Sequence, residues 1–248
     1  MTVLLSAEGL TRRFRRGSEE VAALAGTDLH LRSGELVALV GPSGSGKTTL
    51  LNLLCGWERP DEGSLRWWPG PGGDGGSIAA PGSPGGGSQG SAGPEALATL
   101  PWSELAIVPQ GLGLLEDLTV GENVALPARL AGSRRPPAGL AALLERLGLD
   151  HLERRRPSEV SLGEQQRASV ARALLCHPLL VLADEPTAHQ DAGWAASVMG
   201  ALREVAGSGG SCLVATHNRE ALDQADRVLT IRDGRIGHNV GQWRSSSS

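Results

Sequence analysis

Residues 41–50 read GPSGSGKTTL, and this stretch has the form G-x-x-x-x-G-K-[ST] of a phosphate-binding loop. The apolar run ELVALVG at 35–41 leads into it, and a helical spacing of apolar residues follows over 47–56. The loop is therefore expected to join a strand to a helix. Its glycines would let backbone N–H groups point inward around a phosphate chain, at the positive end of that helix. This context predicts a P-loop nucleotide site rather than a glycine-rich turn without function.

Lys47 is the only lysine of the chain, and the other 22 basic residues are arginines. Either side chain can supply a solvated positive charge, so a single exception marks a position where shape matters. An ammonium group is a compact point charge on a thin stem, whereas a guanidinium is a wide planar fork. We infer that Lys47 reaches the β- and γ-phosphates through a narrow cradle, while the hydroxyl of Thr48 is offered to Mg²⁺.

Length and composition exclude several classes of protein. The 248 residues are enough for one α/β domain with a full core, and a formal net charge of -4 does not favour nucleic acid as a partner. The longest apolar runs are far shorter than the roughly 20 residues of a membrane span, and no secretory signal pattern opens the chain, so membrane association is expected only through a partner. Widely spaced Cys55, Cys176 and Cys212 predict reduced thiols rather than a zinc site or a disulfide framework.

Short strand and helix patterns alternate along the chain, which predicts an α/β fold with a mostly parallel sheet and helices on both faces. Three β-rich runs occupy 2–40, further strands are expected at 105–110, 179–183, 212–216 and 227–232, and helical patterns lie around 119–131, 137–147, 163–176 and 191–206. Between Pro69 and Pro94, 20 of the 26 residues are Gly, Pro or Ser. This stretch is predicted to be a flexible insert at a hairpin tip.

The second half of a nucleotide site should be an acidic residue at the end of a buried strand, and LLVLADE at 179–185 supplies two. Asp184 is predicted to hold Mg²⁺, and Glu185 to face the γ-phosphate and polarise a water molecule as general base. An acidic pair in this place could also merely cap the next helix. The presence of the P-loop favours the catalytic interpretation.

The segment EVSLGEQQRASVARALL at 159–175 resembles the signature motif and the following helix of ATP-binding cassette (ABC) transporter ATPases. That family's pattern Leu-Ser-Gly-Gly-Gln/Glu is matched by VSLGE at 160–164. Other family marks fall in order: Gln110 for the glutamine loop, Asp191 after the acidic pair, and His217 for the switch histidine. The resemblance covers residues 3–237 apart from the insert at 69–94, and the remaining tail at 238–248 is predicted to be disordered.

The resemblance implies a P-loop NTPase fold with an N-terminal antiparallel β subdomain and a helical subdomain that carries the signature. It also implies ATP hydrolysis coupled to transport, with ATP and Mg²⁺ as cofactors. Two cassettes would close head to tail, so that Ser161, Gly163 and Glu164 of one subunit act on the ATP held by the other. ATP binding would join this dimer, and hydrolysis would open it.

Site residues follow from the motifs and the resemblance together. Phe14, the only phenylalanine in a chain without tyrosine, lies where the family stacks a ring on adenine. His217 would contact the γ-phosphate and help to set the attacking water. The ATP-binding residues are then Phe14, Gly41, Pro42, Ser43, Gly44, Ser45, Gly46, Lys47, Thr48, Thr49 and Gln110, the metal ligands are Thr48, Gln110 and Asp184, and the catalytic residues are Glu185 and His217.

Within the family, GLGLLEDLTVGENVALP at 111–127 and RPSEVS at 156–161 look most like ATPase subunits of the lipoprotein-releasing and macrolide-exporting group and their cell-division relatives. This likeness implies an integral-membrane permease as a separate subunit, docked beside Gln110. It also implies a peripheral location on the cytoplasmic face of the cell membrane. The transported substrate is not readable from a cassette.

Two positions depart from the family pattern. Leu162 stands in place of the first signature glycine and should weaken the ATP sandwich without abolishing it, because Ser161 and Gly163 remain. His189 and Gln190 before Asp191 are also unusual for the family. We expect this departure to affect communication between the two ATP sites.

Alternatives remain open for the assembly and for the function. The chain could pair with itself or with a second cassette that has an intact signature. Cassette ATPases of DNA maintenance or of ribosomes are one alternative class, but they usually carry coiled coils, zinc modules or tandem cassettes, none of which this sequence contains. The other alternative is an ATPase that regulates a membrane complex without transport.

Overall fold

The computed structural model describes residues 2–17, 19–68, 76–79, 95–135 and 137–238. Its central element is a six-stranded sheet with the order β10-β9-β3-β8-β7-β6. Every neighbouring pair of strands is parallel except β9 with β10. The predicted mostly parallel sheet is therefore confirmed. Its strands are β3 (Leu36–Val40), β6 (Leu105–Val108), β7 (Leu180–Asp184), β8 (Ser211–Ala215), β9 (Arg227–Arg232) and β10 (Arg235–His238).

A second, four-stranded antiparallel sheet has the order β2-β1-β4-β5. It consists of β1 (Val3–Arg16), β2 (Glu19–Arg32), β4 (Glu62–Trp67) and β5 (Gly76–Ala79). Strand β5 lies inside the Gly/Pro/Ser-rich stretch, so the prediction of a wholly flexible insert is wrong for these four residues, which pair with β4. The strand forms although the stretch is rich in Gly, Pro and Ser, because its backbone pairs with the existing strand β4. The rest of the predicted insert, 69–75 and 80–94, lies outside the described residues, as does most of the predicted tail.

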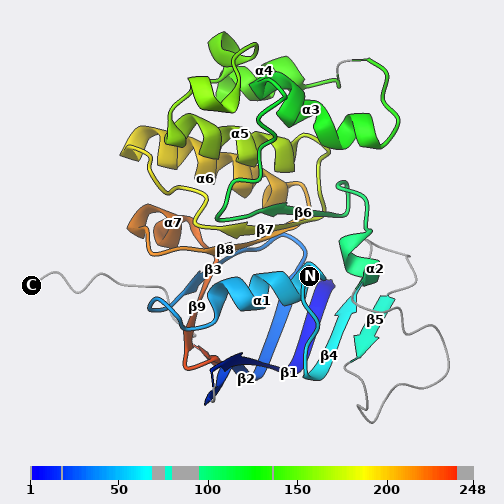
Figure 1. The fold of residues 1–248 in the computed structure, drawn as a ribbon, viewed down its shortest axis with the longest axis vertical. Helices are drawn as coiled ribbons and strands as arrows, with labels where there is room; N and C mark the ends of the chain where they lie inside the picture. Colours follow the sequence, from blue (N-terminus) through cyan, green and yellow to red (C-terminus); the bar gives the residue numbers. More distant parts are fainter. Residues whose placement is uncertain (1, 18, 69–75, 80–94, 136, 239–248) are drawn as a thin grey trace, which may run out of the picture.

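Helix α1 (Lys47–Leu54) lies between the two sheets (Figure 1). Four of its eight residues are buried leucines, and they pack with apolar side chains of β1, β2, β3 and β7 in one core. Strands β3, β7 and β8 are buried on both faces, which explains why their sequences read as continuous apolar runs rather than alternating ones. The loop that precedes α1 is thereby fixed to the centre of the parallel sheet.

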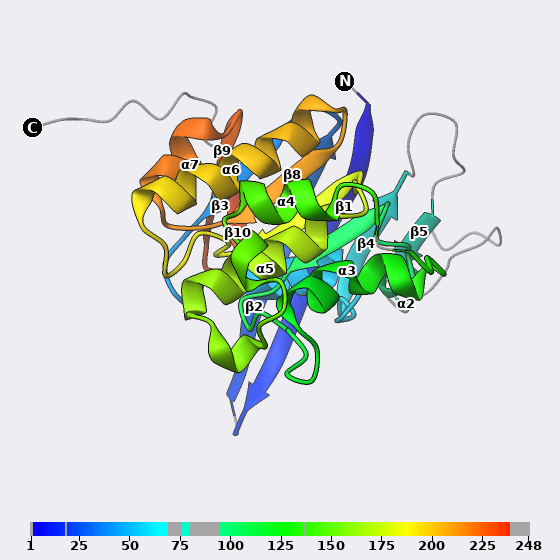
Figure 2. The same cartoon turned by 90° about the horizontal axis from the view of Figure 1, so that it is seen from above.

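The other face of the parallel sheet is covered by helices (Figures 1 and 2). Helices α5 (Leu162–Leu174) and α6 (Ala192–Gly207) contact the sheet, and α3 (Val120–Leu130) and α4 (Leu140–Arg146) pack on α5. All four share a second core with β6, β7 and β8. Helices α3, α4 and α5 form the part of the molecule farthest from the antiparallel sheet (Figure 1), and α5 begins at the signature motif. This arrangement confirms the helical subdomain that the resemblance implied.

Several short elements escaped prediction from the sequence. They are α2 (Glu95–Ala98), α7 (Arg219–Gln224), the turns of 3-10 helix at Asp150–Leu152 and Pro157–Glu159, and the strands β4, β5 and β10. The three β-rich runs expected before residue 40 are two strands of 14 residues followed by β3.

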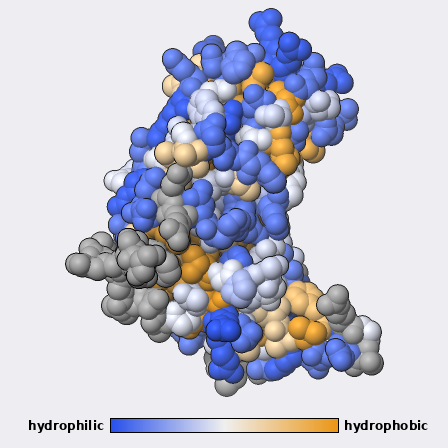
Figure 3. Space-filling model, turned by 90° about the vertical axis from the view of Figure 1, so that its left-hand side faces the viewer, coloured by the Kyte–Doolittle hydropathy of each residue, from blue (hydrophilic) through white to orange (hydrophobic). Residues whose placement is uncertain are grey.

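Among the described residues, no helix is both long and apolar enough to reach across a membrane. The face shown in Figure 3 is mainly hydrophilic, and its hydrophobic areas are small and separate. Cys55, Cys176 and Cys212 are free cysteines in the structure, with Cys55 and Cys212 buried.

Candidate nucleotide-binding site

The loop from Gly41 to Gly46 needs glycine at particular positions. Gly44 and Gly46 adopt φ values of 77° and 105°, a region that other residues rarely enter. A Cβ at Gly46 would lie 2.3 Å from the carbonyl oxygen of Ala23, and one at Gly41 would lie 2.2 Å from the carbonyl oxygen of Ile231. The loop therefore packs tightly against β2 and β9, and no side chain larger than the hydrogen of glycine fits at either end of it.

The ammonium group of Lys47 lies inside this loop. Its Nζ donates to the carbonyl oxygens of Gly41 (2.8 Å) and Pro42 (3.2 Å). Ser45 Oγ is buried nearby and has no hydrogen-bond partner among the described residues. A compact cation and an unused hydroxyl in a loop of inward-turned backbone are the features expected of a cradle for phosphate oxygens.

Asp184 ends strand β7 and faces the first turn of α1. The hydroxyl of Thr48 donates to its Oδ2 at 2.7 Å. Burial raises the pKa of Asp184, and the hydrogen bond from Thr48 opposes this shift. A buried carboxylate beside a hydroxyl gives two hard oxygen ligands, which suits Mg²⁺ completed by water and phosphate oxygens. No cluster of three or more His, Cys, Asp or Glu side chains able to hold a metal by themselves occurs in the described part of the chain.

Glu185 and His217 are in direct contact, which the sequence did not predict. The Oε1 atom of Glu185 lies 2.9 Å from Nδ1 of His217. Glu185 follows β7 and His217 follows β8, and these strands are parallel neighbours, so their carboxyl ends lie at the same edge of the sheet. Glu185 has a left-handed backbone with φ of 50°, and its N–H donates to the carbonyl of Ala215 at 2.8 Å. The sheet thus fixes the direction of this carboxylate.

One cavity of about 1210 Å³ collects most of the predicted site residues. A volume of this size can admit a nucleoside triphosphate. The predicted residues in its lining are Gly41, Pro42, Ser43, Gly44, Ser45, Gly46, Lys47, Thr48, Thr49, Gln110, Asp184, Glu185 and His217. Phe14, Ser161, Gly163 and Glu164 do not line it.

Phe14 lies on the long β1–β2 hairpin, directly across from Val21. Both side chains are partly exposed, Phe14 by 39%. The guanidinium of Arg12 lies 4.8 Å from the centre of the Phe14 ring. The Phe14 ring is therefore contacted by Arg12 and partly exposed to solvent, but it does not line the phosphate cavity.

Ser161 and Glu164 form the N-terminal cap of α5. The Ser161 hydroxyl accepts from the N–H of Glu164 (3.3 Å), and Glu164 Oε2 accepts from the N–H of Ser161 (2.7 Å). A Cβ at Gly163 would lie 2.8 Å from the carbonyl oxygen of His189, so this glycine permits close packing of the signature against the segment after Glu185. The capping bonds fix the first turn of α5, in which Ser161, Gly163 and Glu164 do not contribute to the lining of the cavity of their own chain.

Sequence reasoning missed several residues of the cavity wall. Leu162 and Gln166 both line it, because they are four positions apart on α5 and so share one face of the helix. The Nε2 atom of Gln166 is buried without a hydrogen-bond partner among the described residues. The helical spacing after the signature could have revealed this pair. The other additions are Ala23, Gly111, Leu112, Ala188 and His189.

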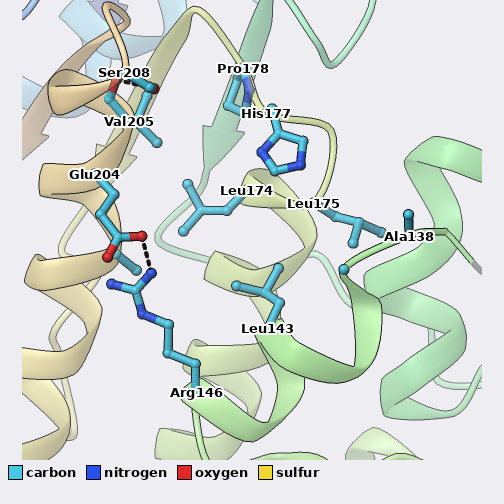
Figure 4. Close-up of a pocket in the computed structure, with 12 residues that line it drawn as sticks. Ala138, Leu143, Arg146, Leu174, Leu175, His177, Pro178, Glu204, Val205 and Ser208 are labelled. Atoms are coloured by element: carbon cyan, nitrogen blue, oxygen red, sulfur yellow. Dashed lines mark hydrogen bonds and ion pairs between the residues drawn. The ribbon is translucent and has the colours of Figure 1, made fainter.

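A second, smaller hollow of about 250 Å³ lies between α4, α5 and α6 (Figure 4). An ion pair between Arg146 and Glu204 lies at one side of it, and Leu143, Leu174 and His177 point toward it (Figure 4). It contains none of the predicted site residues. The phosphate loop, the acidic pair and the histidine all lie at the larger cavity.

The fold defines the class of protein as a P-loop NTPase, and the cavity brings together the glycine-rich loop, Asp184 and Glu185. The chain matches the family described as "ABC transporter" over residues 24–188. The chain belongs to the ABC transporter family, as an ATP-binding cassette with ATPase activity that uses ATP and Mg²⁺.

Two relatives illustrate the match. The lipoprotein-releasing system ATP-binding protein LolD of Gluconobacter oxydans is 40% identical, and the alignment covers 94% of each chain. The macrolide export ATP-binding/permease protein MacB of Nitrosomonas europaea is 41% identical over 94% of this chain. The chain spans only about a third of that relative, because the alignment covers 33% of it.

Solved structures agree with the fold and with a dimeric assembly of similar cassettes. The dimeric structure of MJ0796, described as a bacterial ABC transporter cassette, has a TM-score of 0.79 and 26% identity, and the match covers 95% of this chain and 97% of that one. The same cassette bound to ADP and Pi, in a dimeric post-hydrolysis state, has a TM-score of 0.78.

Proposed function

We propose that this chain is the ATP-hydrolysing subunit that powers a membrane permease through ATP-driven dimerisation of two cassettes. The observation that carries the proposal is the convergence of Lys47, Thr48, Asp184, Glu185 and His217 on one cavity. These side chains come from three segments far apart along the chain, yet all line the same cavity. Such a set suits hydrolysis, whereas phosphate binding alone needs only the loop.

We assign the individual roles from the motifs, the resemblance and the positions of the side chains. Lys47 and the backbone N–H groups of the loop would bind the β- and γ-phosphates, and Thr48, Asp184 and Gln110 would hold Mg²⁺. Mg²⁺, when bound, offsets the negative charge of the phosphate oxygens. Glu185 takes the proton of the attacking water, and His217 orients the Glu185 carboxylate through the 2.9 Å contact.

The partner follows from the relatives. LolD belongs to a lipoprotein-releasing system, and MacB joins an ATP-binding part to a permease in one protein. We therefore place this chain at the cytoplasmic face of a membrane, bound to a permease that contacts the segment after Gln110. Ser161, Gly163 and Glu164 would complete the ATP site of a second cassette, since they lie outside the cavity of their own chain. Phe14 would support the adenine ring.

Glu185→Gln tests the proposal, because it keeps the shape of the side chain but removes its basicity. The variant should bind ATP, fail to release phosphate, and accumulate as a dimer with Mg·ATP in size-exclusion chromatography. Glu204→Gln, a change to an exposed acid on α6 remote from the cavity, is the matched control. A strictly monomeric profile of Glu185→Gln at micromolar concentration, together with undiminished phosphate release, would contradict the mechanism.

A further inference from the structure

Arg172 is a buried cation that the proposed chemistry does not use. It lies in the second half of α5, with a relative exposure of 6%. Among the described residues, no carboxylate forms an ion pair with it. Burial lowers the pKa of this guanidinium. A buried charge is costly unless other groups compensate it, so its partners must be identified.

The partners of Arg172 are backbone carbonyls of the segment that follows Gln110. Its Nη1 donates to the carbonyl of Gly113 (2.5 Å), and its Nη2 donates to the carbonyl of Leu112 (2.7 Å). Ser169, one turn earlier on α5, donates from its hydroxyl to the same Leu112 carbonyl at 3.0 Å. The ring of Trp102 lies 5.9 Å from the guanidinium carbon. The charge is therefore compensated mainly by this one loop.

The loop is shaped to present these carbonyls. Leu112 and Gly113 both have left-handed backbones, with φ values of 56° and 61°. For leucine this conformation is unfavourable by itself, so surrounding contacts must hold it. The hydrogen bonds from Arg172 and Ser169 are contacts of that kind. Without these hydrogen bonds, fewer contacts would hold Leu112 in the left-handed conformation.

We call the hydrogen bonds from Arg172 and Ser169 to Leu112 and Gly113 the Arg172 clamp. This clamp connects two parts of the ATP site. Gln110, Gly111 and Leu112 line the nucleotide cavity, so the clamped carbonyl of Leu112 is only two residues from Gln110. The opposite end of α5 carries the signature, beginning with its cap Ser161. A movement of α5 would therefore carry the Gln110 segment with it.

We propose that Arg172 is a positioning residue that holds Gln110 at the nucleotide cavity by fastening Leu112 and Gly113 to α5. Arginine suits this place because its planar fork reaches two carbonyls at once, whereas lysine offers one point charge. The proposal rests on the proposed function, in which Gln110 contacts Mg²⁺ or water. It adds that the signature helix and Gln110 move as one unit.

A double-mutant cycle separates this role from general destabilisation. Steady-state phosphate release is measured for wild type, R172Q, Q110A and the double variant. If Arg172 acts through Gln110, R172Q should lower kcat about 10- to 100-fold in the wild-type background but less than about twofold in the Q110A background. The KM for ATP should change less than about threefold, because the phosphate loop is untouched.

Arg167 supplies a matched control on the same helix. It is equally buried, bonds to the carbonyl of Leu147 and lies 4.3 Å from the Trp194 ring, but it does not touch the Gln110 segment. R167Q should lower kcat by the same factor in both backgrounds. If R172Q behaves in this additive way, the proposal is overturned.

Hydrogen–deuterium exchange of the nucleotide-free protein gives a readout that does not depend on activity. Backbone amides of residues 110–118 should exchange at least about tenfold faster in R172Q than in wild type, and at the wild-type rate in R167Q. S169A, which removes one hydrogen bond, should give a smaller acceleration in the same segment and keeps the test available if R172Q does not fold. Unchanged exchange in R172Q, or in S169A where R172Q cannot be folded, would contradict the clamp.

Different results would contradict the proposed function and the role of Arg172. If wild type does not hydrolyse ATP, or if Q110A hydrolyses it normally, the proposed function or its role for Gln110 is wrong. The exchange experiment still decides whether Arg172 holds the loop.

Discussion

Lys47 shows at the residue scale why a single ammonium group persists among arginines. Its Nζ lies against two carbonyls of a loop whose ends cannot accept even a Cβ. A guanidinium carries the same charge but needs a wider space. Lys47→Arg should therefore lose ATP turnover nearly as completely as Lys47→Ala, and it should keep less than about a tenth of wild-type phosphate release, equivalent to a loss above roughly 1.4 kcal/mol.

The control for this substitution is the reverse exchange at a solvated site. Arg13→Lys alters an exposed residue that pairs with Glu62 and should leave turnover unchanged. If Lys47→Arg retained more than about a tenth of the activity, charge alone would explain the lone lysine. The argument from shape would then be wrong.

Single residues also mark how far the sequence could predict the site. The loop, Asp184 and Glu185 were predictable because each motif is local, and strand order then brings them together. The contact between Glu185 and His217 and the clamp by Arg172 were not predictable. Arg172 reaches a carbonyl 60 positions earlier in the chain, and no local pattern encodes such a pairing.

At the scale of elements, β5 corrects the prediction for the insert and changes what its removal should do. Gly76–Ala79 pair with the outer side of β4, and the nucleotide cavity receives no residue from either strand. Replacing 69–94 by a short turn should therefore leave kcat within about tenfold of wild type, measured by phosphate release. It should also expose the edge of β4 and raise aggregation, measured by light scattering on heating.

The outcomes of this replacement are separable. A loss of turnover above about tenfold with an unchanged melting temperature would mean that the insert contributes a contact to the site. Unchanged light scattering would mean that β5 does not protect the β4 edge. A replacement of 80–94 alone, which keeps β5, is the matched control.

Element boundaries illustrate the limits of sequence patterns in the same way. Helix α5 was expected at 163–176 and spans Leu162–Leu174; its start coincides with a capping box of Ser161 and Glu164, a signal that the sequence contains but that the prediction did not use. Helix α4 begins at Leu140, later than its apolar pattern suggested, after Gly139 in a left-handed conformation. The 14-residue strands β1 and β2 contain several register shifts, which break the alternation of apolar residues and made them read as shorter runs.

At the scale of the whole molecule, Leu162 poses the question of which chains form the ATP sandwich. It is the first residue of α5, 46% exposed, and its φ is not left-handed, so leucine causes no backbone strain there. Its side chain lines the cavity of its own chain, and in a dimer it would lie beside the phosphates of the other chain. A homodimer would carry two such residues, whereas a mixed pair could complete the site on Lys47 with an intact signature.

We expect the homodimer, because Lys47, Asp184, Glu185 and His217 share one cavity and Ser161 and Gly163 are present in the same chain. The isolated protein should then hydrolyse ATP slowly, with a specific activity that rises with protein concentration. Leu162→Gly should accelerate turnover roughly five- to a hundredfold, since one recovered phosphate contact contributes on the order of 1–3 kcal/mol. Leu162→Ala controls for side-chain size, and melting curves record the cost of about 1 kcal/mol that glycine imposes on a helix. Phosphate release no higher than that of Glu185→Gln, in both wild type and Leu162→Gly, would contradict the homodimer and favour a mixed pair.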